Sequence, residues 1–117
     1  MTTQEIAYRL VELCRKGEYE TCYKELYSPE IVSIEPDGSS VQGFEAMAQK
    51  GKKWNATIEE FKGSGVGEPV CSGNYFSVPM NMDIKFKNAT EVTHFEEMCV
   101  YQIKEGKIIK EQFFYDE

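Results

Sequence analysis

Two late segments place carboxyl groups at a spacing that suits acid–base chemistry. At every second position they carry a glutamate, a thiol or an aromatic residue: Glu97, Cys99 and Tyr101, then Glu111, Phe113 and Tyr115. Alternate residues of a strand share a face, so each set shares one face if these segments are strands. A glutamate buried among rings must be paired or protonated. The alternative is that tyrosine hydroxyls pair with these acids for purely structural reasons.

His94 is the only histidine, and a pKa near 6.5 suits an imidazole to proton transfer. By alternation it lies on the face opposite Glu97, so we expect it to point outward or to lie at an interface. A bulge of one residue would reverse this, because a slip of register turns every side chain to the other face.

The cysteines, four in number, predict reduced and mostly buried thiols. Cys14, Cys22, Cys71 and Cys99 lie far apart without a C-x-x-C pair, and with a single histidine they predict no zinc site. The glycine-rich segment 63–67 lacks the lysine and hydroxyl residue of a phosphate loop, and we interpret it as a turn or a bulged strand start. We therefore expect no metal and no cofactor.

Composition restricts the class of protein. A chain of 117 residues has room for one core, so we expect a single domain over residues 1–117. A net charge of −7 argues against nucleic acid, and we attribute the one basic cluster, at residues 50–53, to a solvated helix end. No apolar run approaches the roughly 20 residues of a membrane helix. Without a recognisable signal peptide, the expected location is the cytoplasm.

Three helices are predicted in the first half of the chain. Thr2 and Glu5 have the spacing of a capping box, and Gly17 predicts the end of the helix that follows. A second helix follows at once and ends at Ser28–Pro29, because the residue before proline avoids helical conformation. A third follows Gly43, with apolar residues at spacings of three and four.

Strands dominate the rest of the chain. A short one is predicted at residues 31–35, and six alternating apolar residues predict a long one at 76–86. Pro79 has no N–H, so it should lie at an edge, at a bulge or beside a gap in the ladder. Two more strands are predicted at 92–103 and 107–115. Early helices and late meandering strands indicate an α+β fold with a curved antiparallel sheet.

Three motifs follow one another along nearly the whole chain: Leu26-Tyr27-Ser28-Pro29-Glu30-Ile31-Val32 into Ser33-Ile34-Glu35-Pro36, then Val41-Gln42-Gly43-Phe44-Glu45-Ala46, then Gly106-Lys107-Ile108 into Gln112-Phe113-Phe114-Tyr115. In this order the chain resembles the SnoaL-like family of the nuclear-transport-factor-like superfamily, which includes ketosteroid isomerases and polyketide cyclases. The resemblance implies a cone-shaped roll. In that roll, three N-terminal helices pack on a strongly curved, mainly antiparallel sheet and enclose a pocket. It also implies a homodimer formed through the sheet.

Glu35 gains a role from this resemblance. The isomerases place a general base at the end of this strand, directly before a proline, and Glu35-Pro36 stands there. A carboxylate at the mouth of an apolar cavity is desolvated, which raises its pKa and suits proton abstraction. The alternative is a solvent-facing glutamate at a strand end. Leu10 and Cys99 occupy the places of the Tyr and Asp that bind the oxyanion in the isomerases, so ketosteroid isomerase activity itself is not expected.

Two functions remain as hypotheses. The first is cofactor-free acid–base catalysis, of an isomerase, cyclase or hydrolase type, on a small apolar molecule. Glu35 would be the base, with Glu97, Tyr101, Glu111 or Tyr115 as its polar partners. The ligand-binding wall would consist of Trp54, Met80, Met82, Cys99, Phe113 and Tyr115, although Trp54 and the methionines could equally be core residues. The second is a non-catalytic module that binds a small ligand or another protein.

Overall fold

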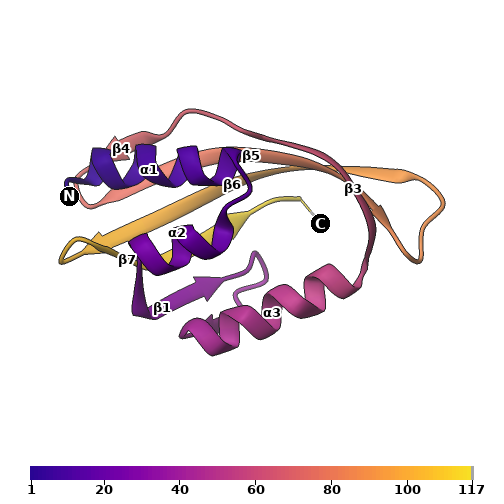
Figure 1. Cartoon of the computed structure of the whole chain (residues 1–117), viewed down its shortest axis with the longest axis horizontal. Helices are drawn as coiled ribbons and strands as arrows, with labels where there is room; N and C mark the ends of the chain where they lie inside the picture. The colour runs from indigo at the N-terminus through magenta and orange to yellow at the C-terminus, as the bar shows by residue number, and fades with distance from the viewer. Residues whose placement is uncertain (117) are drawn as a thin grey trace.

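Helices pack on a curved sheet in the computed structural model, which describes residues 1–116 (Figure 1). In that part of the chain the helices are α1 (Thr3–Arg15), α2 (Tyr19–Leu26) and α3 (Phe44–Ala56). The strands are β1 (Tyr27–Ile34), β2 (Ser40–Gln42), β3 (Ile58–Val66), β4 (Val70–Ser72), β5 (Tyr75–Phe86), β6 (Val92–Lys104) and β7 (Lys107–Phe114). The expected α+β roll with a mainly antiparallel sheet is confirmed.

The predicted signals fix the ends of α1. The Thr2 hydroxyl accepts a hydrogen bond from the Glu5 backbone N–H at 3.1 Å, and the Glu5 carboxylate accepts one from the Thr2 N–H at 2.8 Å. This capping box satisfies two N–H groups that the helix itself leaves unpaired. Gly17 follows the helix with φ of +71°. The apolar stripe of α1 is buried in the core through Ile6, Ala7, Leu10, Val11, Leu13 and Cys14.

The sheet is mixed, with a single parallel pair among the described strands. Its order is β2-β1-β7-β6-β5-β3, with β4 paired to β5, and the sheet is open. β1 runs parallel to β7, and the register sets Ser33 opposite Glu111. β6 and β7 are joined by a tight hairpin, in which Glu105 and Gly106 have φ of 52° and 76°. This arrangement brings the end of β1 beside the last strand of the chain, and that junction forms the site described below.

Pro79 lies beside a gap in the ladder, as its missing N–H predicts. β5 pairs with β6 along its length, whereas on its other side it pairs first with β4 and then with β3. The Pro79 carbonyl accepts a hydrogen bond from the Gly67 N–H at 2.8 Å, so this edge of Pro79 faces the connection between β3 and β4. A Cβ on Gly67 would lie 2.6 Å from the Pro79 ring, and the close approach therefore requires a glycine.

Some boundaries differ from those predicted. α2 ends at Leu26, and β1 begins at Tyr27 instead of residue 31. The cause is tertiary: Tyr27 pairs with Ile108 of β7, and the register shifts between Tyr27 and Val32. The three-residue strands β2 and β4 were not predicted. Residues 63–66 of the glycine-rich segment form the end of β3, after a register shift between Phe61 and Gly63, and Gly67 follows the strand.

The outer face of β6 carries the histidine, as alternation predicts. His94 lies opposite Asp83 of β5, and its Nδ1 lies 2.7 Å from an Asp83 carboxylate oxygen. This contact raises the pKa of His94. Cys14, Cys22 and Cys99 are buried free thiols, and Cys71 is half-buried. None of the three helices is long and apolar enough to cross a membrane.

Candidate functional site

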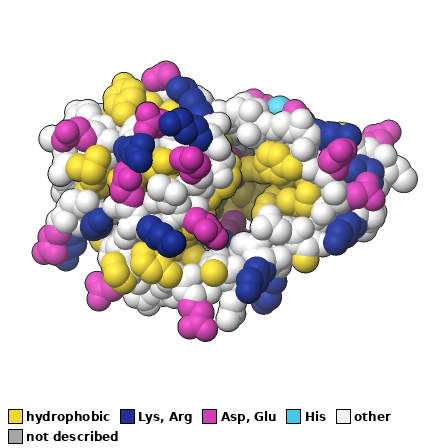
Figure 2. Space-filling view, in the orientation of Figure 1, with side chains coloured by type: hydrophobic (Ala, Val, Ile, Leu, Met, Phe, Trp, Pro, Cys, Tyr) yellow, Lys and Arg dark blue, Asp and Glu magenta, His cyan; other side chains and the backbone are white. Residues whose placement is uncertain are grey.

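A hollow of about 680 Å³ opens between the helices and the concave face of the sheet. Figure 2 shows hydrophobic side chains along its walls, with charged groups around its rim. Its lining comes from α2, α3, both sides of the β1–β2 turn, and strands β5 to β7: Tyr23, Ser33, Glu35, Asp37, Ser39, Ser40, Val41, Met47, Lys50, Gly51, Lys53, Trp54, Met82, Phe95, Glu97, Glu111, Phe113 and Tyr115.

Strand register determines how deep each sheet residue lies. Ser33 of β1, Glu111 of β7 and Tyr101 of β6 stand side by side in one row across the sheet. Phe113 and Cys99 form the next row towards the opening. The spacing of two residues per row follows from the pleat, because only alternate side chains point to the concave face.

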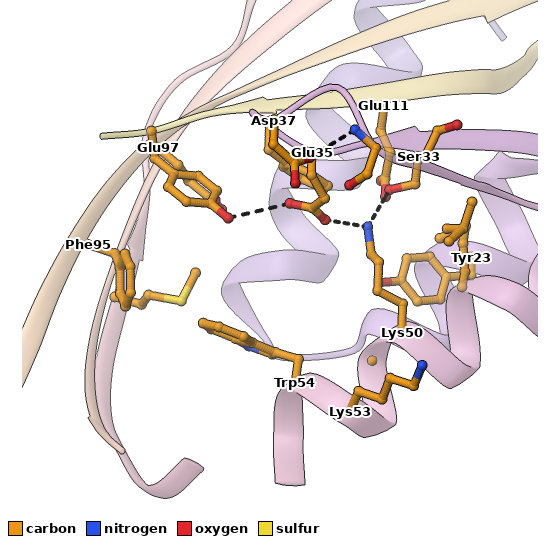
Figure 3. Close-up of a pocket in the computed structure, with 18 residues that line it drawn as sticks. Tyr23, Ser33, Glu35, Asp37, Lys50, Lys53, Trp54, Phe95, Glu97 and Glu111 are labelled. Atoms are coloured by element: carbon orange, nitrogen blue, oxygen red, sulfur yellow. Dashed lines mark hydrogen bonds and ion pairs between the residues drawn. The ribbon is translucent and has the colours of Figure 1, made fainter. Parts of the chain in front are cut away.

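The Lys50 ammonium contacts two polar residues that line the pocket. Its ammonium lies 2.6 Å from Oε1 of Glu35 and donates to the Ser33 hydroxyl at 2.7 Å (Figure 3). The Lys50 and Glu35 side chains are 31% and 28% exposed, so this ion pair is half-buried. The second Glu35 oxygen lies 3.5 Å from the Tyr115 hydroxyl. The predicted base is therefore held between a cation and a phenol.

Behind Lys50 lies a buried carboxyl group. Glu111 is 4% exposed, and its two oxygens accept hydrogen bonds from the Tyr27 hydroxyl at 2.5 Å and the Ser33 hydroxyl at 2.7 Å. Burial raises the pKa of Glu111, while these two hydrogen bonds and the Lys50 ammonium act in the opposite direction. Five residues thus form one hydrogen-bonded chain from Tyr27, through Glu111, Ser33 and Lys50, to Glu35.

Glu97 is a second shifted carboxyl group, on β6. Burial raises its pKa, and the neighbouring carboxylates of Glu35 and Glu111 also raise it, while the Cys99 thiol and the Lys50 ammonium act in the opposite direction. The hydrogen bond that it accepts comes from the Cys99 thiol at 3.6 Å, and a thiol is a weak donor. This environment favours the neutral acid, which can itself donate a hydrogen bond into the pocket.

Aromatic rings form the outer part of the pocket. The Trp54 ring lies 6.1 Å from Phe95, and Phe95 lies 6.2 Å from Tyr115, with the rings meeting edge to face in both pairs. Trp54 is 41% exposed at the rim. The Lys50 ammonium lies 5.2 Å from the centre of the Phe113 ring. Such walls suit a flat apolar molecule.

The structure brings seven of the predicted site residues together around this pocket: Glu35, Glu97, Glu111, Trp54, Met82, Phe113 and Tyr115. Tyr101, Cys99 and Met80 lie elsewhere, which corrects their expected place in the lining. Tyr101 and Cys99 have the predicted facing but are buried in the core, where the Tyr101 ring stacks on Phe76 at 4.7 Å. Met80 packs against that core. Alternation predicts which face a residue occupies, but not whether a helix covers it there.

Three residues of this hydrogen-bonded chain are not predicted as site residues from the sequence: Tyr27, Ser33 and Lys50. Lys50 does not lie at a solvated helix end, as its basic cluster predicts, but points into the pocket. A signal was present, because Lys50 stands three residues after Met47 and four before Trp54, on the apolar face of α3. Leu10, at the place of the isomerase tyrosine, is fully buried in the core.

Metal ligation finds no support in residues 1–116. In that part of the chain, no group of three or more His, Cys, Asp or Glu side chains could hold an ion. Lys50 and the serine and tyrosine hydroxyls are instead suited to binding an oxygen atom of an organic molecule.

Comparisons with known proteins show which family this chain resembles. Its sequence matches the SnoaL-like domain family over residues 1–115. A crystal structure from Mesorhizobium loti, of a proposed SnoaL-like polyketide cyclase, is 30% identical, covers 98% of this chain and 100% of its own, and superposes with a TM-score of 0.90.

Two more distant structures share the fold. A protein with a ketosteroid isomerase-like fold from Catenulispora acidiphila, solved with trimethylamine, is 16% identical, with coverages of 98% and 88% and a TM-score of 0.76. A protein of cystatin-like fold from Xanthomonas campestris is 17% identical, with coverages of 100% and 92% and a TM-score of 0.80. None of the curated proteins matches the sequence. The family match over residues 1–115 and the Mesorhizobium structure together establish that the chain belongs to the SnoaL-like family.

Proposed function

We propose that this SnoaL-like protein binds a small, flat, mainly apolar carbonyl compound and transfers protons on it without a cofactor. The observation that carries the proposal is one aromatic-walled pocket with two kinds of acidic group. Glu35 is a carboxylate held beside Lys50, and Glu97 is a carboxyl group whose pKa is raised by burial. One can accept a proton while the other donates a hydrogen bond.

The proposed step moves one proton. Glu35 removes a hydrogen from the carbon next to the carbonyl, and the electrons of the broken C–H bond form an enolate. Glu97 in its protonated form donates a hydrogen bond to the oxygen, where the negative charge develops. Protonated Glu35 then returns the proton to a different carbon, which completes an isomerisation. Alternatively, it first trades its proton with water and protonates the original carbon, which completes a hydrogen exchange, so the balance needs no reactant other than water.

A second function deserves a test of its own, namely binding without catalysis. The observation that favours it is that Leu10 and Cys99, at the places of the isomerase oxyanion residues, lie buried in the core. Glu35 also has both carboxylate oxygens engaged, by Lys50 and Tyr115. A pocket of this kind could hold a ligand firmly and leave it unchanged.

Binding can be measured through Trp54, the only tryptophan of the chain, which lies at the pocket rim. The probes are 2-tetralone, a bicyclic ketone, and tetralin, the hydrocarbon of the same shape. We expect 2-tetralone to change the Trp54 fluorescence at lower concentration than tetralin. Equal affinities, or the absence of any change up to millimolar concentration, would contradict the proposed carbonyl site.

A matched pair of variants tests the assigned donor. Glu96 and Glu97 are neighbours on opposite faces of β6, and Glu96 is exposed. Glu97→Leu should remove most of the preference for 2-tetralone over tetralin, because leucine cannot donate a hydrogen bond, and Glu96→Leu should keep it. Loss of the preference in both variants would show that overall charge, and not the Glu97 carboxyl group, determines it.

We also propose that the protein is a homodimer formed through the outer face of the sheet. Met98 and Phe114 lie opposite each other on β6 and β7, and their side chains point away from the pocket. They are 41% and 47% exposed, which is unusual for a pair of large apolar neighbours on a strand. A second copy that covers this face would bury them.

A further inference from the structure

The hydrogen-bonded chain from Glu35 to Tyr27 continues beyond the pocket into the core. Ser33 is fully buried and Glu111 is 4% exposed. A serine hydroxyl has one proton. Since the Ser33 hydroxyl donates to Glu111 at 2.7 Å, it meets Lys50, also at 2.7 Å, as an acceptor. Donation therefore runs in one direction, from the Lys50 ammonium to Ser33 and from Ser33 to Glu111.

Glu111 receives only hydroxyl donors at its two oxygens in this arrangement, Tyr27 at one and Ser33 at the other. That pattern fits an acceptor on both sides, which is an ionised carboxylate. Lys50 thus lies between two carboxylates. It contacts Glu35 directly and reaches Glu111 through one hydroxyl group.

We infer that Ser33 and Glu111 are positioning residues of the pocket, which hold the Lys50 ammonium beside Glu35 and supply its second counter-ion. This inference rests on the function proposed above, in which Glu35 alternates between carboxylate and acid. When Glu35 takes up a proton, its negative charge disappears, and the half-buried Lys50 loses its direct partner. Glu111 then balances the ammonium, so that Lys50 keeps its place and no second proton has to move.

Several other titratable groups surround Glu111 and belong in any test of its charge. They are Tyr23 and Cys22 of α2, Cys14 of α1, Tyr27 of β1, and Glu97, Cys99 and Tyr101 of β6. Burial raises the pKa of each of the three tyrosines, which keeps them neutral donors near neutral pH. Lys50 and Glu35 act on the pKa of Glu111 in opposite directions, since the cation lowers it and the like charge raises it.

The direct test is a ¹³C NMR titration of the Glu111 carboxyl carbon in the free protein. Lys50→Met and Ser33→Ala should each raise the pKa of Glu111, because each removes a group that stabilises its charge. Glu35→Gln should lower it. The control is Lys52→Met, an exposed lysine on the same helix, which should leave the titration unchanged.

A Glu111 that only braces Tyr27 would behave differently. Its titration would be the same in wild type, Lys50→Met and Glu35→Gln, and that result would overturn the inference. A rise in Ser33→Ala without a rise in Lys50→Met would also overturn it, since the hydroxyl would then act without the ammonium. Thermal melting of each variant confirms that it is folded before it is titrated.

Kinetic measurements distinguish a failure of this inference from a failure of the proposed function. If wild type exchanges the hydrogens of 2-tetralone, Ser33→Ala should lower kcat by roughly 10- to 100-fold with KM within about twofold, as expected for a misplaced catalytic group. A raised KM with unchanged kcat would contradict the positioning role. If wild type exchanges nothing, the proposed function fails, and the NMR titration still decides whether Glu111 is the counter-ion of Lys50.

Discussion

Replacing Glu97 by glutamine should stabilise the protein at alkaline pH. Burial and two neighbouring carboxylates raise the pKa of Glu97, and its hydrogen-bond donor is a thiol. An acid whose pKa is higher in the folded chain binds its proton more tightly when folded. Its contribution to stability is therefore complete below the unfolded value of about 4.3 and is lost as the pH rises through the folded value. At pH 8 the ionised side chain works against folding, and an uncharged amide of the same shape does not.

The size of the gain follows from leaving a partly buried charge with only a weak donor. An incompletely satisfied buried polar group costs about 1–3 kcal/mol, so the gain at pH 8 should be on the order of 1 kcal/mol. For a chain of this length that is a rise of about 4 °C in Tm. Urea denaturation of wild type, Glu97→Gln and the exposed control Glu96→Gln at pH 5 and pH 8 measures it. The gain should be present at pH 8, small at pH 5, and absent in the control. Equal gains at the two pH values, or a loss at pH 8, would refute the reasoning.

Three further predictions concern the buried chain, the sheet and the outer face. Tyr27→Phe removes a donor to the buried Glu111 carboxylate and should lower the free energy of unfolding by about 1–3 kcal/mol in urea denaturation. Since this hydrogen bond lowers the pKa of Glu111, the loss should be larger at pH 8 than at pH 5. A loss of the same size at both pH values would contradict this. Gly67→Ala sets a Cβ 2.6 Å from the Pro79 ring and should cost about 1–3 kcal/mol, which the double variant with Pro79→Ala should partly recover; additive losses would show that the clash is not the cause. Light scattering should give twice the monomer mass for wild type and the monomer mass for Met98→Lys, while Val70→Lys, at an exposed valine of β4, stays dimeric; a monomeric wild type would exclude the proposed interface.

Much of the fold could be predicted because local patterns and tertiary packing agree there. The capping box at Thr2 and the alternation of residues 76–86 act within one element, and both are found as predicted. The start of β1 at Tyr27 could not be predicted, because it depends on pairing with Ile108, some eighty residues later. The short strands β2 and β4 likewise exist only through their partners.

The sequence predicts the candidate site only where the alternation of side chains along a strand determines which residues face the pocket. Period two correctly grouped Glu111, Phe113 and Tyr115 on the pocket side of the sheet. It could not tell that Tyr101, on the same side, lies too deep to reach the hollow. The ion pair of Lys50 with Glu35 joins a helix to a strand end, and no periodicity within either segment carries that information.

Hydrogen exchange on 2-tetralone in D₂O tests the central claim most directly, with NMR following the loss of the signals from the carbons beside the carbonyl. The account predicts that the wild-type protein accelerates this exchange above the buffer rate. It also predicts that Glu35→Gln, which keeps the shape of the side chain but cannot accept the proton, slows the protein-catalysed part by roughly 100-fold or more. Exchange at the wild-type rate in Glu35→Gln would contradict the role of Glu35 as the base, and exchange at the buffer rate in the wild type would contradict the proposed proton transfer on this ketone.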